Sequence, residues 1–184
     1  MKIACLGWGS LIWDARNLLI QGEWQTKGPF LPVEYVRKSN NGRLTLVITE
    51  TAEPVQTLWA LMTTVDLEAA KTSLLIREEI PEKKKSTSIG SLIVEEETTD
   101  SIKLIIKKWA IDLKLDAVIW TNLPPKFYDI PGQILTLDKA VEYLRLLDVD
   151  KKGLAEEYIR KTPKQINTEF RRRFEAEFGW TYSG

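Results

Sequence analysis

Apolar positions in the first half of the chain follow the short runs and alternations that are typical of β-strands. We expect strands at residues 2–6, 31–38, 43–50, 55–63 and 89–94. Residues 39–42 are Ser-Asn-Asn-Gly, a composition that predicts a hairpin between the second and third of these strands. A helix from residue 67 to about 78 is expected after Asp66, whose side chain can cap it. The polar, lysine-rich residues 81–88 are expected to form a loop.

The second half of the chain has mainly helical periodicity. We expect helices at residues 99–115, 136–147 and 152–161, and a final helix in which Ile166, Phe170, Phe174 and Phe178 recur every four residues. Residues 117–120 predict one more buried strand, and the prolines at 124, 125 and 131 with Gly132 predict an irregular connection. The pattern predicts an α+β fold, in which a mixed sheet from the first half packs against helices from the second half.

Composition excludes several classes of protein. The 184 residues hold 26 basic and 26 acidic side chains, so the overall charge does not favour nucleic acid or an anionic membrane as a partner. No apolar run approaches the roughly 20 residues that span a bilayer, and the first residues are too short for a secretory signal. One cysteine excludes an internal disulfide and favours a reducing compartment, so we expect a cytoplasmic protein. The oligomeric state stays open.

The chain contains no histidine, and this absence limits the possible chemistry most sharply. Ser-His-Asp and Cys-His catalysis are excluded, as is every imidazole base. A zinc site would need several thiolates, but Cys5 is the only thiol, so we expect no metal. Cys5 lies within an apolar segment and is expected to be a buried thiol. Any catalysis must therefore use carboxylates, lysine, tyrosine, hydroxyl groups or backbone dipoles.

The strongest candidate site is the turn that follows the first predicted strand, where Gly7 and Gly9 flank Trp8 and precede Ser10. Glycines allow backbone conformations in which successive amides converge on one anion or oxyanion. The turn lacks the third glycine of a dinucleotide fingerprint, the Gly-Lys-Ser/Thr of a phosphate-binding loop and the glycine pattern of a nucleophile elbow. The alternative to an anion-binding turn is a tight structural turn that binds no ligand.

The string Leu6-Gly7-Trp8-Gly9-Ser10-Leu11-Ile12-Trp13 resembles the N-terminal signature of the γ-glutamylcyclotransferase-like superfamily. Trp8 stands where the family usually has tyrosine. The resemblance implies a small mixed β-barrel or sheet with flanking helices over residues 1–130. The helical residues 131–184 have no counterpart in the family, and we expect them to form a C-terminal extension that packs on this domain as one compact unit. It also implies an enzyme that cyclises a small γ-glutamyl amine, amino acid or peptide to 5-oxoproline without a cofactor or metal.

The resemblance further implies a glutamate general base after a helix, and Glu78 in Arg77-Glu78-Glu79 matches that position. Glu79 stands where the family usually has glycine. The backbone amides of Trp8, Gly9, Ser10 and Leu11 would then bind the substrate carboxylate or the oxyanion. The alternative interpretation is that Glu78 is a solvent-exposed residue at the end of a helix and has no catalytic role.

Two other functions stay open. One is a non-catalytic module of the same fold that binds a small anion or a partner. The other is an interaction protein that uses an exposed apolar patch on residues 136–178. The basic run at residues 171–173 is flanked by acidic residues and is expected to be a solvated helix face rather than a nucleic-acid site.

Overall fold

The fold was analysed in a computed structural model, which describes residues 1–128 and 133–184. The described chain forms two compact units. Unit 1 comprises residues 1–7, 14–31 and 56–123, and unit 2 comprises residues 8–13, 32–55 and 124–184. The helices of the predicted C-terminal extension thus belong to the same unit as the glycine turn and the hairpin. The predicted division at residue 130 stays a prediction.

Unit 1 is built on a five-stranded sheet with the strand order β2-β6-β1-β8-β7. Its strands are β1 (Ile3–Gly7), β2 (Ile20–Gln25), β6 (Leu58–Met62), β7 (Ile89–Ile93) and β8 (Ala117–Thr121). The central β1 pairs with β8 in parallel and with β6 antiparallel. The carboxyl ends of β1 and β8 therefore lie at the same edge of the sheet.

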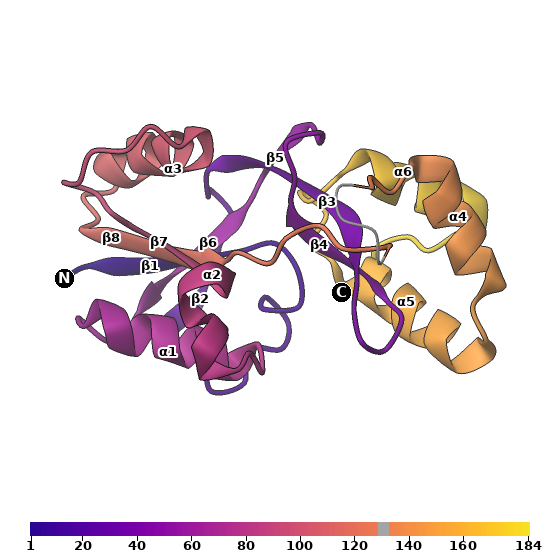
Figure 1. Cartoon of the computed structure of the whole chain (residues 1–184), viewed down its shortest axis with the longest axis horizontal. Coiled ribbons are helices and arrows are strands. Elements are labelled where there is room, and N and C mark those ends of the chain that lie inside the picture. The colour runs from indigo at the N-terminus through magenta and orange to yellow at the C-terminus, as the bar shows by residue number, and fades with distance from the viewer. Residues whose placement is uncertain (129–132) are drawn as a thin grey trace. The chain divides into compact units, whose positions relative to one another are not determined.

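Two helices cover opposite faces of this sheet, α1 (Leu67–Arg77) and α3 (Ser101–Asp112) (Figure 1). On one face the ring of Trp59 from β6 meets that of Trp109 from α3, with centroids 5.6 Å apart. The helix α1 begins at the predicted cap, because Asp66 accepts from the amide of Ala69. The helix α3 begins at a cap that was not predicted, Asp100, which accepts from the amide of Lys103. The core of unit 1 includes every residue of β1.

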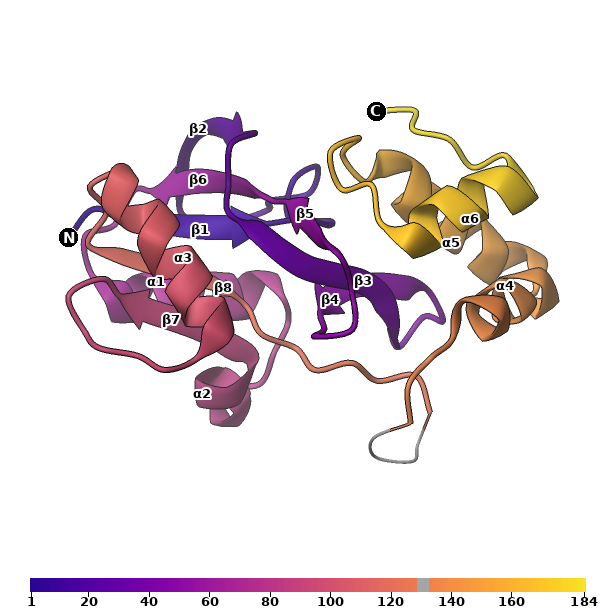
Figure 2. The ribbon, with the colours of Figure 1, turned by 90° about the horizontal axis from the view of Figure 1, so that it is seen from above.

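Unit 2 contains most of a three-stranded sheet with the order β4-β3-β5, and three helices. The elements are β3 (Phe30–Lys38), β4 (Leu44–Ile48), β5 (Pro54–Gln56), α4 (Leu137–Leu146), α5 (Val149–Lys161) and α6 (Glu169–Phe178). Figure 2 shows the three helices gathered together. Tyr35 of β3 and Phe174 of α6 pack edge to face in the core, with ring centroids 5.7 Å apart.

The predicted α+β class is confirmed. Each strand predicted from the apolar pattern is present, although residues 55–63 divide between β5 and β6. The strands of the described residues form two sheets, rather than the closed barrel that the resemblance allowed as one form of the fold. Of the predicted connection, Pro131 and Gly132 lie outside the described residues.

The structure adds one strand that was not predicted and corrects two predictions. The strand β2 was not predicted, because its alternation is broken by Gly22 at φ 69° and by a register shift between Gln21 and Gln25. The expected loop at 81–88 contains a 3-10 turn (Glu82–Lys84) and the short helix α2 (Lys85–Ser88). The basic run is not a uniformly solvated face, since Arg171 is buried.

Arg171 is 2% exposed, and its guanidinium spans the segment before α6. Its Nη1 donates to the carbonyls of Pro163 (2.6 Å) and Ile166 (3.1 Å), and its Nε donates to Glu175 (2.9 Å). The carbonyl of Pro163 also accepts from the amide of Ile166 (3.0 Å), so the guanidinium adds a second donor there and ties the segment before α6 to the helix. The local sequence predicts only a charged helix. The burial of Arg171 depends on the path of the segment before α6, whose carbonyls at Pro163 and Ile166 it contacts.

No helix in the described parts of the chain is both long enough and apolar enough to cross a membrane.

Candidate functional site

The glycine turn, residues 8–13, belongs to unit 2 and closes with a hydrogen bond from the amide of Ile12 to the carbonyl of Gly9 (3.0 Å). The amides of Trp8, Gly9 and Leu11 find no acceptor among the residues that the structure describes. Amide donors without an internal acceptor are the chemical requirement for holding a carboxylate or an oxyanion. The binding role of the turn stays a prediction, but its donors are present.

Trp8 anchors this turn to the edge of β4. Its side chain is 5% exposed, and its indole Nε1 donates to the carbonyl of Leu46 (3.1 Å). The amide of Leu46 in turn donates to the hydroxyl of Tyr158 from α5 (3.4 Å). Two side chains therefore satisfy the backbone of an edge strand that, among the described residues, has no partner strand on that side. The side chain of Trp8 is structural, and only its backbone remains a candidate for binding.

Gly9 serves a different purpose from the one that the sequence suggested. Its φ lies outside the left-handed region, which among the described glycines is occupied by Gly22, Gly42 and Gly179. A Cβ at Gly9 would instead overlap the hydroxyl oxygen of Tyr158 and lie 3.3 Å from its Cζ. The glycine is needed for the close approach of a side chain, not for a special backbone conformation.

Tyr158 also organises the surroundings of the turn. Its ring meets the ring of Trp13 edge to face, with centroids 5.4 Å apart, and the ring of Tyr35 at 6.2 Å. The guanidinium carbon of Arg43 lies 5.5 Å from its ring centroid. Sequence reasoning assigned no role to Tyr158 or Arg43. No local signal marks them, because they approach the turn only through tertiary folding.

Glu78 lies in unit 1 as the C-cap of α1. Its side chain is 17% exposed, so the alternative interpretation of Glu78 as a fully solvated residue is wrong. Its Oε1 accepts from Nη1 of Arg77 (2.7 Å), and Arg77 is held in turn by two hydrogen bonds to the carbonyl of Asp14 (2.7 and 3.0 Å). The neighbouring Glu79 is different, because its side chain is 76% exposed and pairs with Arg16 at the surface.

The charge of Glu78 acts on the thiol of Cys5 in β1, and both residues belong to unit 1. The thiol is buried, as predicted. Burial raises the pKa of Cys5, the negative charge of Glu78 raises it further, and the positive charge of Arg77 lowers it. Both charges therefore act on the middle of β1, two residues before the strand ends at Gly7. The carboxylate has the partial burial that a general base needs.

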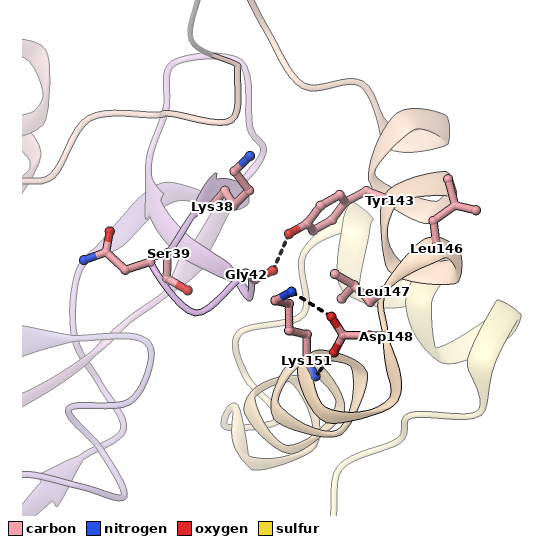
Figure 3. Close-up of a pocket in the computed structure, with 9 residues that line it drawn as sticks. Lys38, Ser39, Gly42, Tyr143, Leu146, Leu147, Asp148 and Lys151 are labelled. Atoms are coloured by element: carbon pink, nitrogen blue, oxygen red, sulfur yellow. Dashed lines mark hydrogen bonds and ion pairs between the residues drawn. The ribbon is translucent and has the colours of Figure 1, made fainter.

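A separate cavity of about 320 Å³ opens in unit 2 between the β3–β4 hairpin and the junction of α4 with α5 (Figure 3). It is lined by Lys38, Ser39, Asn40, Gly42, Tyr143, Leu146, Leu147, Asp148 and Lys151. Tyr143 donates to the carbonyl of Gly42 (2.6 Å), and Lys151 pairs with Asp148 (2.7 Å). The first contact joins the hairpin to α4, and the second lies within the first turn of α5. None of the predicted site residues lines it.

The predicted site residues thus fall into two groups, with Glu78 in unit 1 and Trp8, Gly9, Ser10 and Leu11 in unit 2. No cluster of three or more potential metal-binding side chains occurs in the described parts of the chain. Comparison of the chain with family models, with curated proteins and with solved structures finds no match.

Proposed function

We propose that this protein is a γ-glutamylcyclotransferase-like enzyme that converts a γ-glutamyl amine, amino acid or peptide to 5-oxoproline. The observation that carries the proposal is the Glu78 carboxylate, which is mostly buried beside the strand that leads into the glycine turn. The turn supports it, because three of its amides lack an acceptor among the described residues. A base and a set of oxyanion donors are the two requirements of this reaction.

In the proposed reaction, Glu78 takes a proton from the substrate's α-ammonium, and the free amine attacks the γ-carbonyl carbon. A C–N bond of the lactam forms, and the C–N bond to the departing amine breaks. The α-nitrogen loses two protons in all and the released amine gains two, with Glu78 returning the proton that it took. The amides of Trp8, Gly9 and Leu11, which lack an acceptor among the described residues, hold the substrate carboxylate or the oxyanion. The reaction consumes no water and no oxidant.

The test is the variant Glu78→Gln, assayed for release of 5-oxoproline from a panel of γ-glutamyl compounds. Loss of a general base typically lowers the rate by about 10² to 10⁴-fold, and we expect a loss of that order with the far-UV circular dichroism unchanged. Glu79→Gln is the matched control, because Glu79 is adjacent but exposed. Turnover by Glu78→Gln at the wild-type rate would contradict the proposal.

One observation favours a second candidate, a non-catalytic module that binds a small anion. Arg77 donates to Glu78, and such an ion pair can hold a carboxylate in place as a structural group. This candidate predicts that the wild-type protein binds γ-glutamyl compounds in calorimetry without releasing 5-oxoproline. Release of 5-oxoproline by the wild type that is lost in Glu78→Gln would support the enzyme and exclude the non-catalytic module.

A further inference from the structure

The strand β7 forms one edge of the sheet in unit 1, because β8 is its only partner strand among the described residues. The two strands pair in an unbroken register, and Ser88, just before β7, accepts from the amide of Asn122, just after β8 (2.7 Å). Bonded residues alternate along an antiparallel pair. The backbone groups of Ile89, Ser91 and Ile93 therefore point away from β8, to the open edge.

Within the described chain, two donors and two acceptors at this edge have no partner. The amide of Ile89 is already used, since it donates to the carbonyl of Lys85 at the end of α2. The carbonyl of Ile93 accepts from the amide of Glu96 (3.1 Å). The amide and carbonyl of Ser91, the carbonyl of Ile89 and the amide of Ile93 are left free. A row of free groups of this kind can pair with a further strand.

These free groups are complementary to themselves. When two copies of β7 lie antiparallel about a two-fold axis between their Ser91 residues, each Ser91 amide faces the other Ser91 carbonyl. In the same register the Ile93 amide of one copy faces the Ile89 carbonyl of the other. Every free donor and acceptor thereby gains a partner, and no group that the chain already uses is required. Two-fold pairing through one shared surface is the commonest arrangement in homodimers.

The strand β7 lacks the features that keep the opposite edge of the sheet from pairing. Its sequence, Ile-Gly-Ser-Leu-Ile, has no charged residue and no proline, and its register with β8 has no shift. The opposite edge strand, β2, carries Glu23 and a register shift between Gln21 and Gln25. Charges and bulges on an edge strand hinder the addition of another strand. The edge at β7 is therefore the one suited to pairing.

The segments on either side of β7 carry opposite charges. Lys83 and Lys84 precede the strand and Glu95 and Glu96 follow it, with all four side chains exposed. None of the four forms an ion pair within the described chain. Antiparallel pairing of β7 with itself places the start of one strand beside the end of the other, so the lysines of one copy meet the glutamates of the other. The charges thus favour a second copy of this chain over an unrelated strand.

We propose that the protein forms a dimer in which β7 of one copy pairs antiparallel with β7 of the other. The two five-stranded sheets then become one continuous sheet, with the two-fold axis between the Ser91 residues. Ion pairs between the lysines and glutamates that flank β7 lie at both ends of the joined strands. The dimer does not depend on the proposed function, because its interface uses neither Glu78 nor the glycine turn.

The backbone pairing is tested by sedimentation equilibrium, in which the wild type should have twice the mass of the chain. Ser91→Pro removes an amide that the chain itself does not use, and proline is tolerated on an edge strand. This variant should be monomeric with its far-UV circular dichroism unchanged. Ser91→Ala, the matched control, keeps the amide and should stay dimeric. In hydrogen exchange, the Ile93 amide should be protected in the wild type and lose this protection in Ser91→Pro.

The flanking charges are tested by reversing them. Lys83→Glu/Lys84→Glu and Glu95→Lys/Glu96→Lys should each raise the dissociation constant of the dimer by roughly 10- to 100-fold, because like charges then face each other at both ends. An equimolar mixture of the two double variants should associate again, since each end of a mixed dimer joins opposite charges. Adding Ser91→Pro to both variants should abolish this association, which excludes a merely non-specific attraction.

The matched control for charge is Lys27→Glu/Lys108→Glu. Lys27 follows β2 and Lys108 lies on α3, both exposed, so the same change in charge is made away from β7 and should leave the dimer intact. A wild type that stays monomeric at its highest soluble concentration would overturn the proposal and leave this edge to a strand of a different protein. A dimer that persists in Ser91→Pro, or that ignores the charge reversals, would also overturn it.

Discussion

The hydroxyl of Tyr158 sits against the backbone of Gly9 and leaves no room for a Cβ at that position. Residue 9 ends up next to residue 158 because the turn and α5 both dock on the edge of β4. This contact explains why the motif has glycine here. It also gives a direct test of how the turn is held.

We expect Gly9→Ala to destabilise the protein by about 1–3 kcal/mol, the usual cost of forcing extra volume into a packed site. Tyr158→Phe should cost about 1 kcal/mol by itself, because the amide of Leu46 loses an acceptor. In the double variant, removal of the hydroxyl relieves the overlap, so the two costs should not add. Urea denaturation of all four proteins measures this coupling, and strictly additive costs would contradict the contact.

Glu79 occupies a left-handed conformation, with φ 55°, immediately after the C-cap of α1. Glycine adopts this conformation without strain, whereas a residue with a Cβ does so only at a cost in free energy. We therefore expect Glu79→Gly to stabilise the protein by about 0.5–1 kcal/mol, the strain relief being partly offset by the entropy of the unfolded chain. Thermal or urea denaturation measures the change.

The control is Glu79→Ala, which removes the same exposed ion pair with Arg16 but keeps a Cβ. An exposed pair contributes little, so this variant should be close to neutral or slightly destabilised. A gain in stability for alanine equal to that for glycine would show that the carboxylate, not the backbone, is the source of strain.

Glu34 makes stability depend on pH, because it is buried in unit 2 and its pKa is raised. Burial is the main cause, and the nearby charge of Glu169 adds to it. Hydrogen bonds to the carboxylate act in the opposite direction, from Thr168 (2.5 Å), the amide of Tyr35 (2.9 Å) and the amide of Phe170 (3.2 Å). The folded protein thus holds the proton at a pH where the unfolded chain has released it.

A raised pKa in the folded state means that the native protein binds more protons than the unfolded chain, so stability falls as pH rises through this interval. The contribution is complete below the ordinary carboxyl pKa of 4.5 and is lost as pH rises through the folded value. We expect the stability of the wild type relative to Glu34→Gln to decrease from pH 4 upwards, as measured by urea denaturation. Glu169→Gln should weaken this pH dependence, because the charge of Glu169 contributes to the raised pKa of Glu34. A difference between wild type and Glu34→Gln that rises with pH would contradict the assignment.

Much of the local structure was predictable from the sequence because its causes are local. The cap of α1 at Asp66 and the cap of α3 at Asp100 follow from a side chain that reaches an amide three residues ahead. Strand β1 follows from a short uninterrupted apolar run that ends at a glycine turn, a pattern that favours a buried strand over a helix. The sequence also marked the glycine turn and Glu78 as chemical candidates, and it excluded imidazole chemistry altogether.

Only the tertiary structure decided which groups those candidates meet. Arg43 and Tyr158 are 115 residues apart in the chain, and no periodicity indicates that a guanidinium will lie over that ring. The local sequence likewise does not indicate that the carboxylate of Glu34 will accept from an amide at the start of α6, or that Arg171 will be buried. Hydrogen-bond caps and apolar periodicity act over a few residues, whereas the partner of a buried polar group depends on which distant segments fold against it.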